Sequence, residues 1–218
     1  MLLQMTFIGI AILTFLLFYL GTGKSKTVLI FGSIWLIVCG VLSYRGFFQN
    51  TSVLPPRMIW VLLPVLILVV LCYRTMNVLN LKINYLIAIH VLRLPVELVL
   101  FQLFLKGSIP VLMTFQGWNF DIFIGISAIA MLSYSMLAGK RLNIKIFRWW
   151  NILGLLFLFL IVSIAILSAP SPIQLLAFET PNIALITFPY TLLPAVIVPF
   201  VLLSHLLCLK CIRGKICD

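Results

Sequence analysis

Two long segments of the sequence are apolar on all sides, so neither could present a polar face to water in a soluble fold. Residues 60–71 (WVLLPVLILVVL) are apolar throughout, and residues 153–167 (LGLLFLFLIVSIAIL) are apolar on every helical face. Strands of membrane barrels alternate apolar and polar side chains, so these segments do not fit a barrel. They are typical of helices that cross a lipid bilayer, because helices satisfy their own backbone hydrogen bonds there.

The composition extends this interpretation to the whole chain. Of 218 residues, 64% are hydrophobic and only 9% are charged, whereas about a quarter of the residues in soluble domains are charged. The sequence therefore predicts an all-α, polytopic integral membrane protein with the lipid bilayer as its partner, folded as a single domain over residues 1–218. We expect about seven transmembrane helices, near residues 5–22, 28–44, 57–73, 83–105, 120–138, 148–168 and 182–208.

The basic residues predict an orientation. With the N-terminus outside and the C-terminus inside, eleven Lys and Arg residues lie on the cytoplasmic side and three on the outer side, as the positive-inside rule requires. The net charge of +11 then faces anionic lipid headgroups, and no nucleic acid is expected as a partner. The cytoplasmic set is Lys24, Lys26, Arg74, Lys82, Lys140, Arg141, Lys145, Arg148, Lys210, Arg213 and Lys215.

The expected helix 83–105 carries three polar residues, His90, Arg93 and Glu97, within about 60° of one another on one face. Arg93 lies about 15 Å from the start of this helix, near the middle of the bilayer. Charges at such a depth mark function or tight pairing. Two interpretations stay open: Arg93 and Glu97 neutralise each other along the helix, or they line a polar cavity beside a kink at Pro95.

Two further candidate segments follow. In the first, Asp121 or Asn119 caps the helix 120–138, or both face Glu97 and form a polar pocket that opens outward. In the second, three prolines in the helix 182–208 leave backbone carbonyls without donors, and Tyr190 is the candidate site residue there. The predicted intramembrane binding cluster is therefore His90, Arg93, Glu97, Asn119, Asp121 and Tyr190.

Several families are excluded by missing residues. A retinal protein needs a Lys in its last helix, and 182–208 has none. A rhomboid-like protease needs a serine and a histidine at one depth, whereas we expect Ser127 near the outer side and His205 near the inner side. Zinc hydrolases need about three His, and His90 and His205 are the only two, at different expected depths. No metal and no cofactor are expected, and His205 is given no role.

The pattern H-x-x-R-x-P-V-E at 90–97, followed by I-P-x-x-M-T-F-x-G-x-N-F-D at 109–121, resembles bacterial multi-pass membrane proteins of unassigned activity. The resemblance implies a bacterial cytoplasmic (inner) membrane and no particular activity. The expected function is transport of a small solute, or proton-linked transport, through a polar cavity on helix 83–105. Two alternatives stay open, a structural or accessory subunit with a membrane protein partner and a lipid-modifying enzyme, so whether the chain is an enzyme is undecided.

Overall fold

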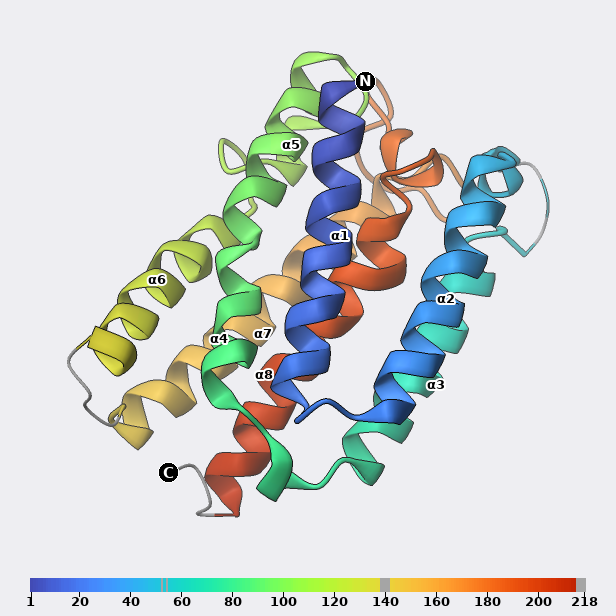
Figure 1. Cartoon of the computed structure of the whole chain (residues 1–218). Helices are drawn as coiled ribbons and strands as arrows, with labels where there is room; N and C mark the ends of the chain where they lie inside the picture. The colour runs from blue at the N-terminus through green and yellow to red at the C-terminus, as the bar shows by residue number, and fades with distance from the viewer. Residues whose placement is uncertain (52, 54, 138–141, 215–218) are drawn as a thin grey trace.

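The chain forms a bundle of antiparallel helical segments in the computed structural model (Figure 1). The structure describes residues 1–51, 53, 55–137 and 142–214, and within these ranges every regular element is helical. Three of the basic residues used to predict the orientation, Lys140, Arg141 and Lys215, lie outside the described residues, as does the expected end of helix 120–138 at residue 138.

The described ranges contain eight α-helices, which make seven helical segments because α4 and α5 form one segment; seven were expected. The helices are α1 (Leu2–Gly21), α2 (Lys26–Tyr44), α3 (Ile59–Thr75), α4 (Ile83–Val91), α5 (Arg93–Leu105), α6 (Asp121–Leu137), α7 (Ile144–Leu167) and α8 (Val198–Arg213). α4 and α5 continue each other across Leu92, and a π-helical turn, η5 (Leu193–Ile197), leads into α8.

Five of these segments are long and apolar enough to cross a membrane, counted over the described residues. They are α1, α2, α4 with α5, α7, and η5 with α8; α3 and α6 are shorter apolar helices. Large apolar side chains cover the outer surface, such as Phe31 on α2 at 60% exposed and Phe159 on α7 at 75% exposed. Such a surface is typical of lipid-facing helices, because a soluble monomer rarely exposes large contiguous apolar patches.

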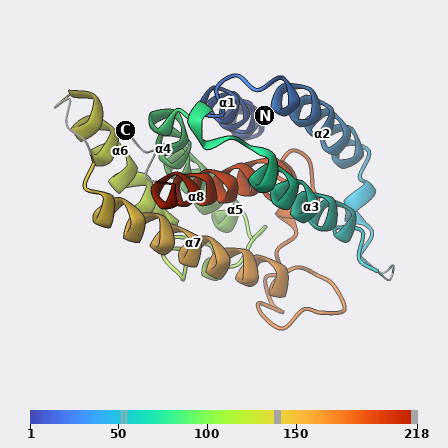
Figure 2. The same cartoon turned by 90° about the horizontal axis from the view of Figure 1, so that it is seen from below.

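α8 lies in the middle of the bundle (Figure 2), where it packs against α1, α3, α4 and α7. α6 covers the other side of α4 and α5. α2 and α3 form the edge of the bundle, and few residues of either helix are buried. The polar residues of α4, α5 and α8 are therefore enclosed on several sides.

The last helix begins later than expected. The prediction placed it over residues 182–208, but residues 182–191 form a loop with one 3-10 turn, Ala184–Ile186. Helix starts only at Leu192, first with the π-helical turn Leu193–Ile197 and then as α8 from Val198. The loop is anchored by Asn182, whose side-chain amide donates to the Ala165 carbonyl at 3.1 Å. Prolines explain the late start, because Pro189 and Pro194 each lack a backbone donor.

A hydrogen bond from α2 satisfies the backbone carbonyl that a third proline, Pro199, leaves without its usual donor. Pro199 cannot donate to the Ala195 carbonyl four residues earlier. The indole nitrogen of Trp35 donates to that carbonyl instead, at 2.8 Å. A second bond, from the Ser43 hydroxyl to the Thr191 hydroxyl at 2.9 Å, also joins α2 to this region.

Replacing Trp35 with Phe is expected to lower the free energy of unfolding by about 1 kcal/mol, because a carbonyl inside the bundle loses its donor. Titration with a denaturing detergent, followed by circular dichroism, measures the change. Trp60→Phe is the control, since Trp60 is 63% exposed and its replacement should stay within about 0.5 kcal/mol. Equal stabilities of the two variants would contradict this role of the indole.

Candidate functional site

The helix break between α4 and α5 positions the charged residues of the site. Pro95 has no amide to bond to the carbonyl of Val91 four residues before it. The chain tightens at this point, and the Leu92 amide bonds to the Ile89 carbonyl at 3.1 Å in a three-residue turn. The irregularity expected at Pro95 is therefore present. Arg93 begins α5 immediately after the break.

Arg93 forms a salt bridge with Asp121, the first residue of α6, with 2.9 Å between Nη1 and Oδ1. The interpretation in which Arg93 and Glu97 neutralise each other along one helix stays a prediction, and the ion pair that the described residues show joins Arg93 to Asp121. Arg93 is 4% exposed and Asp121 is 7% exposed, so the pair is shielded from water. Removing one partner of such a pair leaves an uncompensated buried charge, and the pair holds α5 against α6.

Asn119 connects Glu97 to the start of α6. Its side-chain nitrogen donates to Glu97 Oε1 at 2.6 Å and to the carbonyl of Met113 at 3.1 Å. Its side-chain oxygen accepts from the Asp121 amide at 3.1 Å, which is an Asx turn at the start of the helix. Asn119 and Asp121 thus approach Glu97 and Arg93 as the pocket interpretation expected, although both carboxylates are buried and the site is closed to the outside.

His205 of α8 reaches the same group of charges. The side-chain nitrogen of Asn151 donates to the Phe147 carbonyl at 2.8 Å, so its oxygen is the acceptor that faces His205 Nδ1 at 2.9 Å. The proton of His205 is therefore assigned to Nδ1, and Nε2 keeps its lone pair. Arg93 Nη2 lies 3.4 Å from that Nε2 and donates to it.

His90 stacks on His205, with ring centroids 3.9 Å apart. The hydroxyl of Ser204 donates to the Val201 carbonyl at 2.7 Å and therefore accepts from His90 Nε2 at 2.9 Å. The indole of Trp150 packs at a steep angle against both imidazoles, with centroid distances of 5.1 Å and 5.3 Å. Both rings are fully buried. Aromatic contacts fix their orientations together with one hydrogen bond to His90 and two to His205.

A glycine on α7 makes room for this stack. A Cβ atom added at Gly154 would overlap the Cε1 and Nε2 atoms of His205. Only glycine lets the α7 backbone come this close to the imidazole. The packing of α7 on α8 therefore depends on one residue without a side chain.

The cluster formed by His90, Arg93, Glu97, Asn119, Asp121, Asn151, Ser204 and His205 has unequal charges and unfilled hydrogen bonds. With neutral imidazoles, one guanidinium faces two carboxyl groups. Among the residues that the structure describes, three buried atoms of the cluster have no hydrogen-bond partner: His90 Nδ1, Arg93 Nε and Glu97 Oε2. Buried polar groups usually have partners. Such a cluster is suited to bind a proton, water or a small polar ligand.

The sequence prediction included one residue that the described contacts do not connect to this cluster. Tyr190 packs edge-to-face against Phe7 of α1 with 5.2 Å between ring centroids. No described hydrogen bond joins it to His90, Arg93 or Glu97. The other five predicted residues lie together, although whether they bind anything stays a prediction.

The sequence prediction also omitted Asn151, Ser204 and His205. The expected separation of His90 and His205 in depth is wrong, because their rings stack. The cause is the misplaced last helix: α8 continues to Arg213, so His205 lies eight residues, about 12 Å, inside its end. One sequence signal could have identified them: α4, α7 and α8 are apolar helices, and each carries polar residues at a similar depth.

Comparison of the chain with protein-family models, with curated proteins and with solved structures finds no match. The chemistry of the cluster itself is therefore the basis for inferring a function.

Proposed function

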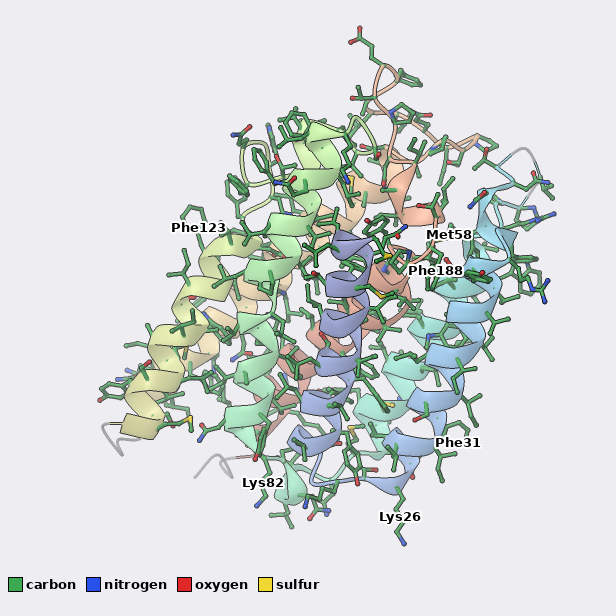
Figure 3. All side chains as sticks on the ribbon, turned by 45° about the horizontal axis from the view of Figure 1, so that its top comes forward. Lys26, Phe31, Met58, Lys82, Phe123 and Phe188 are labelled. Carbon is green, nitrogen blue, oxygen red and sulfur yellow. The ribbon has the colours of Figure 1, made fainter. Side chains whose placement is uncertain are left out.

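We propose that the chain is a seven-crossing protein of a bacterial cytoplasmic membrane, with its N-terminus outside and its C-terminus inside. The support is the asymmetry of basic residues between the two ends of the bundle. Lys26 and Lys82 lie at the same end (Figure 3). The same end carries Arg74 in the last turn of α3, and Lys210, which donates to the carbonyls of Tyr73 and Met76 beside it. The opposite end has Arg45, Arg57 and Lys106. The end with more basic residues is expected in the cytoplasm.

We further propose that the protein carries out proton-linked transport and that Glu97 is its proton-binding group. One observation carries the proposal: Glu97 is 2% exposed, one of its oxygens accepts a hydrogen bond from Asn119, and the other has no partner in the described part of the chain. The salt bridge uses the only guanidinium in the cluster on Asp121. A second carboxylate charge inside the bundle would then be uncompensated, which is costly in a membrane.

A proton on Glu97 removes that excess charge in the closed form. The carboxyl then donates through Oε2 to water or to a small polar solute when the bundle opens, and it releases its proton where water enters. Asn119 keeps Glu97 in place in both states, because its amide nitrogen can donate to a carboxyl or to a carboxylate. Arg93, Asp121 and the two imidazoles are the other titratable groups around it.

The test is proton flux into liposomes that contain the purified protein and a trapped pH-sensitive dye, driven by a potassium diffusion potential. Wild-type protein should acidify the lumen faster than empty liposomes. Glu97→Gln keeps the acceptor for Asn119 but cannot exchange a proton, so flux should fall to the level of empty liposomes. If proton flux requires a co-transported solute, a screen of small solutes at fixed membrane potential should identify one that increases the flux through wild-type protein. The same solute should not increase the flux through Glu97→Gln.

Glu179→Gln is the matched control, since Glu179 lies exposed in the loop after α7 and its replacement should leave the flux unchanged. Equal flux through wild type and Glu97→Gln, with both proteins folded, would refute the role of Glu97. No flux above empty liposomes, with or without any solute, would refute transport.

A structural or accessory subunit is the second candidate, and the Arg93–Asp121 pair favours it. A closed ion pair between consecutive helices holds a bundle together without any ligand. In that case a second membrane protein should co-purify in fixed stoichiometry. A serine-based lipid hydrolase is not favoured, because Ser204 accepts a hydrogen bond from His90, whereas a nucleophile must donate to its base.

A further inference from the structure

A pocket of about 660 Å³ lies between α1, α2, α3 and the segment η5–α8, away from the polar cluster. Its depth is lined by apolar and aromatic side chains, including Trp35, Val65, Leu68 and Phe200. Its other end lies at the α1–α2 and α3–α4 connections and is lined by polar residues, which are Thr22, Ser25, Thr27, Thr75, Asn77 and Asn80. The pocket is therefore amphipathic along its length.

The polar end of the pocket lies among cations. Lys26 stands between Ser25 and Thr27, which both line the pocket, and Lys82 follows Leu81, which also lines it. Both lysines are exposed at this end of the bundle (Figure 3). The described acidic residues lie elsewhere: Glu97 and Asp121 are in the cluster, and Glu179 is in the loop after α7.

The connections that form this end are fixed in place. The Lys82 amide donates to the Gly21 carbonyl at 2.8 Å, which joins the α3–α4 connection to the end of α1. The Lys210 ammonium donates to the carbonyls of Tyr73 and Met76 at 2.7 Å and 2.8 Å. The polar end is thus a preformed rim rather than a loose gap between loops.

We propose that this pocket binds an anionic phospholipid, with an acyl chain in the apolar depth and the phosphate headgroup beside Lys26 and Lys82. The positive charges of Lys26 and Lys82 favour an anionic headgroup over a neutral one. The apolar part of the pocket would be filled by an acyl chain, which a free phosphate ion does not have. The inner face of a membrane offers such lipids, and each nearby cation strengthens their binding. The site is separate from the proton-linked function proposed above and does not depend on it.

Native mass spectrometry of the delipidated protein, titrated with dioleoyl phosphatidylglycerol or dioleoyl phosphatidylcholine, tests the proposal. We expect phosphatidylglycerol to bind about thirtyfold more tightly, the factor that two lysines supply. Lys26→Gln combined with Lys82→Gln should remove that preference. Lys106→Gln combined with Lys145→Gln removes the same charge away from the pocket and should preserve it.

A second pair of variants tests the acyl-chain end. Leu68→Trp fills the apolar depth and should weaken phosphatidylglycerol binding about tenfold by excluding the chain. Leu66→Trp places the same side chain on α3 where residue 66 is 62% exposed, and binding should be unchanged. Equal binding of the two lipids would overturn the proposal, as would wild-type affinity in folded Leu68→Trp, since the lipid would then be bound only at the basic surface.

Discussion

Arg93→Leu is expected to lower the free energy of unfolding in detergent by about 3–5 kcal/mol, because Asp121 would stay buried without its partner. The same loss is expected for Asp121→Leu, since the guanidinium would then be left without its carboxylate. Both side chains are almost completely enclosed, so neither can turn to water to regain solvation. The midpoint of a titration with denaturing detergent, followed by circular dichroism, measures these losses.

The double variant Arg93→Leu with Asp121→Leu should recover much of the stability, because two apolar side chains replace a buried ion pair at little cost. Arg148→Leu is the control for loss of one positive charge, since Arg148 is exposed, and it should change stability by about 0.5 kcal/mol or less. If the double variant is as unstable as the sum of the single variants, the two charges are not coupled to each other.

Gly154→Ala is expected to destabilise the protein by about 2–3 kcal/mol, the upper part of the range for overpacked cores. The added methyl group would overlap the His205 ring, and that ring cannot move freely. Asn151 holds it on one edge, Arg93 on another, and His90 lies against its face. The substitution should also change the fluorescence of the protein, because Trp150 packs against the same ring.

Gly40→Ala is the matched control, since a Cβ atom there has nothing within 4 Å. It should be neutral or slightly stabilising, because alanine favours helix more than glycine does. Comparison of melting temperatures in the same detergent separates the two effects. Equal melting temperatures for Gly154→Ala and wild type would mean that α7 and α8 can move apart without cost, contrary to the close approach described above.

Helix content and position were predictable from the sequence because apolar segments of this length have few alternative structures. The break near Pro95 followed from a missing backbone donor. The start of the last helix was not predictable from hydropathy, since residues 182–191 are as apolar as a helix but contain Pro189 next to the region where helix begins. Apolar character alone does not distinguish a buried loop from a helix.

The candidate site was predictable on α4 and α5 but not across the bundle. His90, Arg93 and Glu97 share a helix face, so their proximity follows from helical geometry. The pairing of Arg93 with Asp121 depends on how α5 packs against α6, which periodicity does not specify. His205 was missed for the same reason, because its partners come from α4, α5 and α7.

The salt bridge joins two helices that are consecutive in the chain, and this matters for how the protein enters the membrane during synthesis. α5 and α6 leave the ribosome one after the other, so Asp121 becomes available to neutralise Arg93 before α7 and α8 have been made. With the proton on Glu97 that is proposed above, the buried charges of this helical hairpin balance when it partitions into lipid. The imidazole of His205 arrives last with α8, so the guanidinium gains this acceptor only after the final helix has been made.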